Sequence, residues 1–155
     1  MPIFQFVAER ITGRKFRNIS QTQEEALIDV LTAAKAIDGV LRDVERDELL
    51  EIIQKLEWKG DVSMATYVEQ SIERATAIEP IPGELEDCFT EISERLQEDW
   101  LREEAYYLAS RIVLADDQIV ENERLLLKYL VKGFGISADR QQDIIKVIRK
   151  EMGMP

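Results

Sequence analysis

The stretch ADDQIVENERLLLKYLV at residues 115–131 decides the fold, because it joins the end of one amphipathic helix to the start of the next. The stretch IDGVLRDVERDELLEII at residues 37–53 repeats it earlier in the chain, with Asp38 aligned to Asp116. In each copy an Asp-Gly or Asp-Asp pair favours a turn, and the following apolar residues recur at the spacing of one helix face. The sequence therefore predicts two related helix–turn–helix units.

Helical spacing continues outward from the repeat over nearly the whole sequence, and no stretch shows the alternation of a β-strand. The segment Pro80-Ile81-Pro82-Gly83 breaks the pattern and separates two halves, 22–79 and 84–152. Thr22 and Glu25 have the spacing of a capping box at the first helix. We predict an all-α fold, a compact antiparallel bundle of six or seven helices with an internal helix–turn–helix repeat. The expected helices are 24–38, 45–58, 63–78, 84–97, 99–115, 121–133 and one that starts near Ser137 or Asp139.

The composition suits a single small domain with an acidic surface. The 155 residues are 45% apolar, and 31 acidic against 20 basic residues give a net charge of −11. Such a charge repels nucleic acids and anionic membranes and favours cations or basic partners. Residues 1–21 are different, because this arm is basic and apolar. It is either a weak membrane or partner anchor or a strap laid on the 22–152 domain.

The sequence has no histidine and one cysteine, Cys88. Histidine-dependent catalytic triads and histidine-containing zinc sites are therefore excluded. Carboxylates remain, and these suit Ca²⁺, Mg²⁺ or Mn²⁺. Cys88 is expected to be a small core residue. No apolar stretch is long enough for a transmembrane helix or forms a signal-peptide core, so we expect a cytoplasmic protein.

The acidic residues of the two turns are the candidate metal ligands: Asp38, Asp43, Glu45, Asp116, Asp117, Glu121 and Glu123. Glu45 and Glu123 fall in a first helical turn, where the helix dipole alone explains a negative charge. Asp38 and Asp116 fall at helix C-termini, where the dipole disfavours one. Either an Asx-turn or a bound cation would satisfy them. Neither turn has the ligand spacing of an EF-hand.

The segment 115–137, which ends in GFGIS, resembles the tellurite-resistance TerB-like family, whose pattern is Ala-Asp-Gly-x-Ile-x-x-x-Glu, an apolar helix and Gly-Ile-Ser. The 38–45 copy resembles the family's first motif, and the resemblance covers roughly residues 22–150. Asp117 replaces the usual glycine. Arg42 and Val120 stand where the family often has a Ser or Thr cap, so Asp43 is the alternative cap in the first copy.

The resemblance implies an all-helical module linked to tellurite resistance and bacterial stress responses, metal-responsive or scaffolding, often associated with membrane complexes. The acidic residues that match its motif are Asp38, Glu45, Asp116 and Glu123, and no catalytic residues are carried over.

Three functions follow from these residues. The first is a non-enzymatic module whose acidic loops bind a divalent cation or a protein partner that is basic or membrane-associated. Such a partner would place this cytoplasmic protein peripherally at the inner membrane face. The second is a purely structural adaptor domain with no metal site. The third is a small carboxylate hydrolase that uses Glu103 and Glu104.

Overall fold

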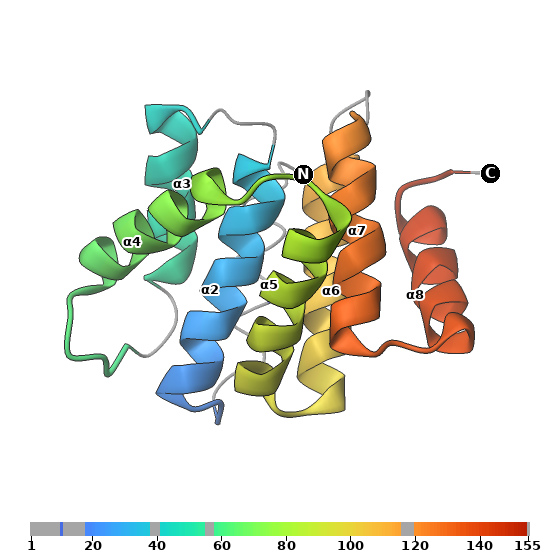
Figure 1. The fold of residues 1–155 in the computed structure, drawn as a ribbon, viewed down its shortest axis with the longest axis horizontal. Helices are drawn as coiled ribbons and strands as arrows, with labels where there is room; N and C mark the ends of the chain where they lie inside the picture. Colours follow the sequence, from blue (N-terminus) through green and yellow to red (C-terminus); the bar gives the residue numbers. More distant parts are fainter. Residues whose placement is uncertain (1–9, 11–17, 38–40, 55–57, 116–119, 155) are drawn as a thin grey trace.

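The computed structural model describes residues 10, 18–37, 41–54, 58–115 and 120–154. This part of the chain is all-helical and contains no strand, as predicted (Figure 1). Its seven helices are α2 (Gln21–Ala36), α3 (Asp43–Ile53), α4 (Met64–Ala77), α5 (Pro82–Leu96), α6 (Asp99–Leu114), α7 (Glu121–Phe134) and α8 (Ala138–Glu151).

The helices α2 and α6 form the centre of the bundle, and successive helices run in alternating directions (Figure 1). α2 buries 12 of its 16 residues and α6 buries 10 of 16, because both are apolar around most of their circumference. α8 buries only Ile144 and Ile148 and packs on α6 as an outer helix. One core unites side chains from both halves of the chain.

The helices α5 and α7 pack against each other most extensively, and Gly133 allows their approach. A Cβ atom at Gly133 would lie 2.7 Å from the Cβ of Phe89 and 2.8 Å from the backbone of Phe89 and Thr90. Beside this contact, the rings of Phe89 and Phe134 meet edge to face with their centroids 5.9 Å apart. The glycine inside α7 therefore serves the packing of the two helices, and α7 continues past it to Phe134.

The internal repeat is present in the fold and extends over three helices. The alignment of Asp38 with Asp116 also aligns both ends of α2 with both ends of α6, and it aligns the first residues of α3 and α7. With a shorter offset, α4 aligns with α8, and each of these two helices has 14 residues. Their N-caps also correspond, because Ser63 and Ser137 each accept a hydrogen bond from a backbone N–H three residues later.

Two predicted helix boundaries were wrong. α2 is capped by Ser20, whose hydroxyl accepts from the backbone N–H of Gln23, while the Gln23 side chain accepts from the backbone N–H of Ser20. Thr22 and Glu25 therefore lie inside the helix. α3 ends at Ile53 rather than at residue 58. Trp58 lies outside the helix, and its indole N–H donates to the carbonyl of Val62, 2.9 Å away.

Candidate ligand-binding cavity

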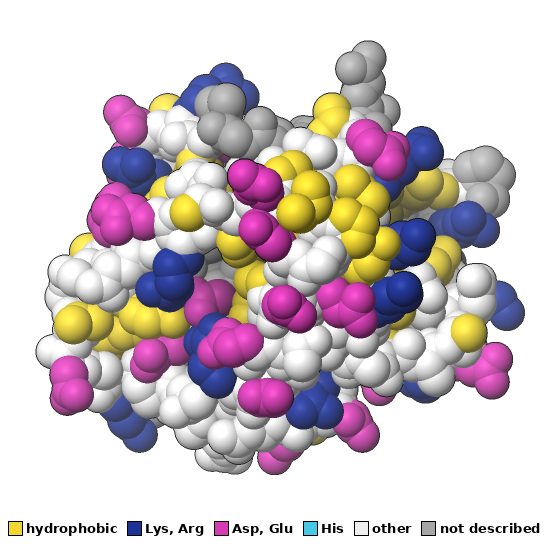
Figure 2. All heavy atoms as spheres, viewed as in Figure 1, with side chains coloured by type: hydrophobic (Ala, Val, Ile, Leu, Met, Phe, Trp, Pro, Cys, Tyr) yellow, Lys and Arg dark blue, Asp and Glu magenta, His cyan; other side chains and the backbone are white. Residues whose placement is uncertain are grey.

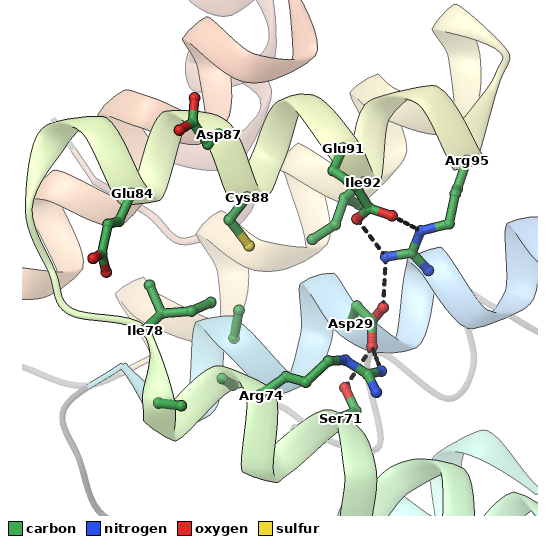
Figure 3. Close-up of a pocket in the computed structure, with 13 residues that line it drawn as sticks. Asp29, Ser71, Arg74, Ile78, Glu84, Asp87, Cys88, Glu91, Ile92 and Arg95 are labelled. Atoms are coloured by element: carbon green, nitrogen blue, oxygen red, sulfur yellow. Dashed lines mark hydrogen bonds and ion pairs between the residues drawn. The ribbon is translucent and has the colours of Figure 1, made fainter.

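A cavity of about 550 Å³ opens between α2, α4 and α5 (Figure 3). Ligand pockets in proteins usually enclose roughly 300–1,000 Å³, so this volume fits a ligand or several side chains. In the space-filling view, the face that carries α4 and α5 is hollowed between these helices, with charged side chains beside the hollow (Figure 2). Its apolar wall consists of small and aliphatic side chains: Ala33, Ala75, Ala77, Ile78, Cys88 and Ile92.

Asp29 of α2 forms the polar end of the cavity, and its carboxylate is buried. Its Oδ1 accepts from Ser71 Oγ at 2.6 Å and from Arg74 Nη2 at 2.9 Å. Its Oδ2 accepts from Tyr67 Oη at 3.1 Å and from Arg95 Nη2 at 2.7 Å. Each oxygen thus has two donors, which fills the hydrogen-bonding capacity of a carboxylate. Asp29 therefore ties α4 and α5 to α2.

Carboxylates already balance the charges of the two arginines in this network. Arg95 also pairs with Glu91, through Nε at 2.7 Å and Nη2 at 2.9 Å. Burial alone would lower the pKa of Arg95, but the hydrogen bonds to Glu91 and the charge of Asp29 outweigh it and raise the pKa above its ordinary value. Burial would lower the pKa of Arg74 as well, but the charge and the hydrogen bond of Asp29, together with Tyr67, raise it overall. Both guanidinium groups remain charged and partnered.

The cavity region also contains a phenol and a thiol that stay protonated. Burial and the nearby charge of Asp29 raise the pKa of Tyr67 to about 12. The same two causes raise the pKa of Cys88 to about 11. Since the thiolate is the reactive form of cysteine, Cys88 is a poor nucleophile at neutral pH. Cys88 packs against the core as a partly buried residue, and it also lines the cavity.

The lining of the cavity carries an excess of negative charge. Four carboxylates line it against two guanidinium groups, which leaves a net charge of −2. Glu84 lies on the cavity side of α5, whereas the carboxylate of Asp87 turns away from it (Figure 3). One oxygen of Glu84 accepts from the backbone N–H of Glu79 at 3.0 Å, and the other accepts from no described residue. A positively charged ligand would therefore find a carboxylate at the end opposite Asp29.

The predicted ligand Glu45 is engaged within the fold. Its carboxylate pairs with Lys35 Nζ at 2.7 Å and Arg42 Nε at 3.1 Å, and it accepts from the Arg42 backbone N–H at 3.4 Å. Partial burial would raise the pKa of Glu45, but the hydrogen bond and charge of Lys35 lower it overall. Glu45 thus closes the start of α3 and links it to the last turn of α2.

Glu123 occupies the corresponding place in the second copy. It is buried, and its carboxylate accepts from the Val120 backbone N–H at 3.1 Å. The two glutamates, which the repeat aligns, therefore cap α3 and α7 in the same way, which agrees with the helix-terminus interpretation of these positions. The hydrogen bond comes from the backbone, so the missing Ser or Thr at Arg42 and Val120 is not needed for it.

The remaining predicted ligands are exposed or lie outside the described residues. Asp43 is the first residue of α3 rather than its cap, and its exposed carboxylate lies 3.8 Å from Arg46. Glu121, the first residue of α7, is also exposed. Asp38, Asp116 and Asp117 lie outside the described residues. Within the described part of the chain, no three acidic or cysteine side chains are placed to hold a metal ion.

The two glutamates of the hydrolase hypothesis are held by separate arginines. Glu103 accepts from Arg140 at 2.9 and 2.5 Å, and Glu104 accepts from Arg10 at 3.1 and 2.8 Å. Glu104 is buried. Neither carboxylate lines the cavity.

Asp29, Arg74 and Arg95 were not identified from the sequence. Asp29 lies within the run ALIDVL, where a charge interrupts apolar residues on a helix that is buried on most sides. That interruption was a signal that a polar partner must exist, because buried carboxylates are paired. The arginine partners lie 45 and 66 residues further along the chain, and no local pattern identifies them.

No helix in the described ranges has the length and apolarity needed to cross a bilayer. Comparison with family models, curated proteins and solved structures finds no match to this chain.

Proposed function

We propose that this chain is a non-enzymatic binding module, and that the cavity between α2, α4 and α5 takes an apolar group attached to a positive charge. The observation that carries the proposal is an open cavity of about 550 Å³ with an apolar wall and the carboxylate of Glu84 on the cavity side (Figure 3). Apolar walls with a few placed polar groups are the usual composition of ligand sites.

The chemistry of the cavity favours binding over catalysis. Asp29 already accepts four hydrogen bonds, so it has no lone pair left to act as a general base. Cys88 keeps its proton near neutral pH, which removes the nucleophile. What the site offers a ligand is apolar surface and the second oxygen of Glu84.

The proposal can be tested with three simple probes of equal chain length: hexylamine, hexanol and hexanoate. Cys88 is the sole cysteine and lines the cavity, so its rate of reaction with N-ethylmaleimide at alkaline pH, where part of the thiol is ionised, reports occupancy. Hexylamine should slow this reaction most and raise the melting temperature, since a ligand bound only to the folded state stabilises it. Hexanoate should protect least. If Cys88 reacts at the same rate with each of the three probes as it does without a probe, the proposal is refuted.

A second proposal rests on the repeated loops and the resemblance to TerB-like proteins. It holds that a divalent cation, Ca²⁺, Mg²⁺ or Mn²⁺, or a basic protein binds the acidic loops as part of a role linked to tellurite resistance or stress. Its support is the correspondence between the helices that flank the two loops, α2 with α6 and α3 with α7. Since Glu45 and Glu123 cap helices, the available oxygens would come from Asp38, Asp43, Asp116, Asp117 and Glu121.

The second proposal has its own test. Chelator-stripped protein is melted with and without each cation, beside the variant Asp116→Asn/Asp117→Asn. A cation-dependent rise in melting temperature that the variant loses supports the loops. No rise at millimolar cation refutes a metal site and leaves the adaptor alternative.

A further inference from the structure

The repeat assigns positions elsewhere in the chain to three residues of the cavity wall, and larger side chains stand at those positions. The repeat aligns α2 with α6 and α4 with α8 along their whole lengths. The lining residues Ala33 and Ala77 thus correspond to Arg111 and Glu151. These two larger side chains pair with each other, since Arg111 Nη1 lies 2.5 Å from Glu151 Oε2.

A third position follows the same pattern. The offset that aligns α2 with α6 also aligns Arg10, which is in helical conformation, with Cys88 of α5. The Arg10 guanidinium lies 4.5 Å from the centroid of the Tyr107 ring and makes two hydrogen bonds to Glu104. Tyr107 corresponds to Asp29, which lines the cavity with Cys88. Arg10, from the N-terminal arm, and Tyr107 of α6 therefore meet at the positions aligned with Cys88 and Asp29.

Two alanines and a cysteine of the cavity wall thus stand where the aligned positions have arginine, glutamate and arginine. Both of those arginines pair with a carboxylate, Arg111 with Glu151 and Arg10 with Glu104. The aligned positions therefore favour an arginine head group paired with a carboxylate. Arg74 and Arg95 cannot supply this at the open site, because Asp29 and Glu91 hold both of them at the polar end.

We propose that the cavity receives an arginine side chain from an amphipathic helix of a partner protein, which rests on the proposed function of the cavity. The stem would lie on Ala33, Ile78 and Cys88, and the head group would pair with Glu84, whose second oxygen accepts from no described residue. The cavity exceeds one arginine side chain, so apolar residues one turn away on the same helix would fill the rest. This is the helix-in-groove mode of recognition.

The test uses a labelled helical peptide of roughly 15 residues, long enough to hold helix when stabilised by a side-chain staple. It is built from Leu, Ala and Gln with one central Arg, and matched peptides carry Gln or Glu there. Fluorescence anisotropy should show the Arg peptide binding about tenfold more tightly than the Gln peptide, the equivalent of one partly desolvated charge pair. The Glu peptide should bind weakest.

Two protein variants on the same helix provide the matched control. Glu84→Gln should weaken binding of the Arg peptide about tenfold and leave the Gln peptide unchanged. Glu86→Gln removes the same charge from α5 at an exposed position outside the cavity and should leave both unchanged. Equal effects of the two variants would overturn the pairing with Glu84.

Filling the cavity provides the decisive experiment. The variant Ala33→Arg/Ala77→Glu rebuilds the pair seen at Arg111 and Glu151 and should abolish peptide binding. If this variant does not fold, wild-type protein with N-ethylmaleimide on Cys88 serves instead, and it should lose binding as well. Peptide binding that survives the blocked cavity overturns the inference.

The same experiments separate this inference from the proposed function. If hexylamine protects Cys88 but the Arg peptide binds no better than the others, only this inference is refuted. If hexylamine also fails to protect Cys88, the proposed function is refuted as well. Loss of self-association in the filled variant would identify a second copy as the occupant and would also overturn the inference.

Discussion

Replacing Asp29 with asparagine tests the network that forms the polar end of the cavity. The substitution keeps the shape of the side chain but turns one carboxylate oxygen into an amide NH₂ group. Wherever that group points, it faces one hydroxyl and one guanidinium group, either Ser71 and Arg74 or Tyr67 and Arg95. The hydroxyl can turn and accept from the amide, but the guanidinium group only donates. One hydrogen bond is therefore lost, and the charge that balances the arginines disappears.

The expected cost is about 2 kcal/mol in the free energy of unfolding. Removing one partner of a fully buried ion pair costs about 3–5 kcal/mol. The cost is smaller here because the side chain of Arg74 is 51% exposed and that of Arg95 is 26% exposed, so water can solvate both. Arg95 also keeps its bond to Glu91.

The assay is urea unfolding followed by circular dichroism, with thermal unfolding beside it. For a chain of this size, about 2 kcal/mol corresponds to a fall of about 4–8 °C in melting temperature. Asp87→Asn is the control, because Asp87 is exposed and pairs with no described residue. It should change stability by less than about 0.5 kcal/mol.

A double-mutant cycle with Arg95→Gln separates the ion pair from general disruption. The two substitutions should be less costly together than the sum of the single ones, because each removes the same interaction. A loss below about 0.5 kcal/mol for Asp29→Asn, or strict additivity with Arg95→Gln, would refute the role of Asp29 in joining α2 to α5.

Three further predictions follow from the described contacts. Gly133→Ala should destabilise the protein by about 1–2 kcal/mol in urea unfolding, because the clash with the Phe89 backbone outweighs the gain in helix propensity; a neutral or stabilising result would contradict the close approach. Glu45 has a lowered pKa in the folded state, so its pairing with Lys35 stabilises the protein above the unfolded pKa and is lost as pH falls through the folded one. Glu45→Gln should accordingly lower the melting temperature at pH 7 and reduce its fall below pH 4.5, and parallel curves would count against this. Thiolate absorbance of Cys88 should appear with a midpoint near 11, and a midpoint near 9 would show that the thiol is not desolvated.

The all-α fold and the repeat were predictable because they depend on local signals. Apolar spacing gave α6 and α7 to within a residue at each end, and the repeated turn located the two helix–turn–helix units. The N-cap of α2 was placed at Thr22 instead of Ser20, because two overlapping segments that start at these residues both have the spacing of a capping box. Only the folded geometry shows that Ser20 caps the helix.

The cavity could not be predicted, because its residues come from three helices and leave the space open only by having small side chains. Ala33, Ala77 and Cys88 are ordinary residues on their own helices. They stand out only by comparison with the positions that the repeat aligns with them, Arg111, Glu151 and Arg10. Those larger side chains contact one another or Tyr107 in the fold. The acidic turns attracted attention in the sequence because their charge is conspicuous, although two of their glutamates prove to cap helices.

The most direct test of the cavity is a titration of isotope-labelled protein with hexylamine, followed by backbone amide chemical shifts. We predict shifts that saturate with a single binding constant and are confined to α2, α4 and α5 around Asp29, Cys88 and Ile78. The variant Ala33→Arg/Ala77→Glu should abolish them. Shifts concentrated instead on the acidic turns at 38–45 and 116–123, or spread over the surface without saturation, would contradict the assignment of this cavity as the binding site.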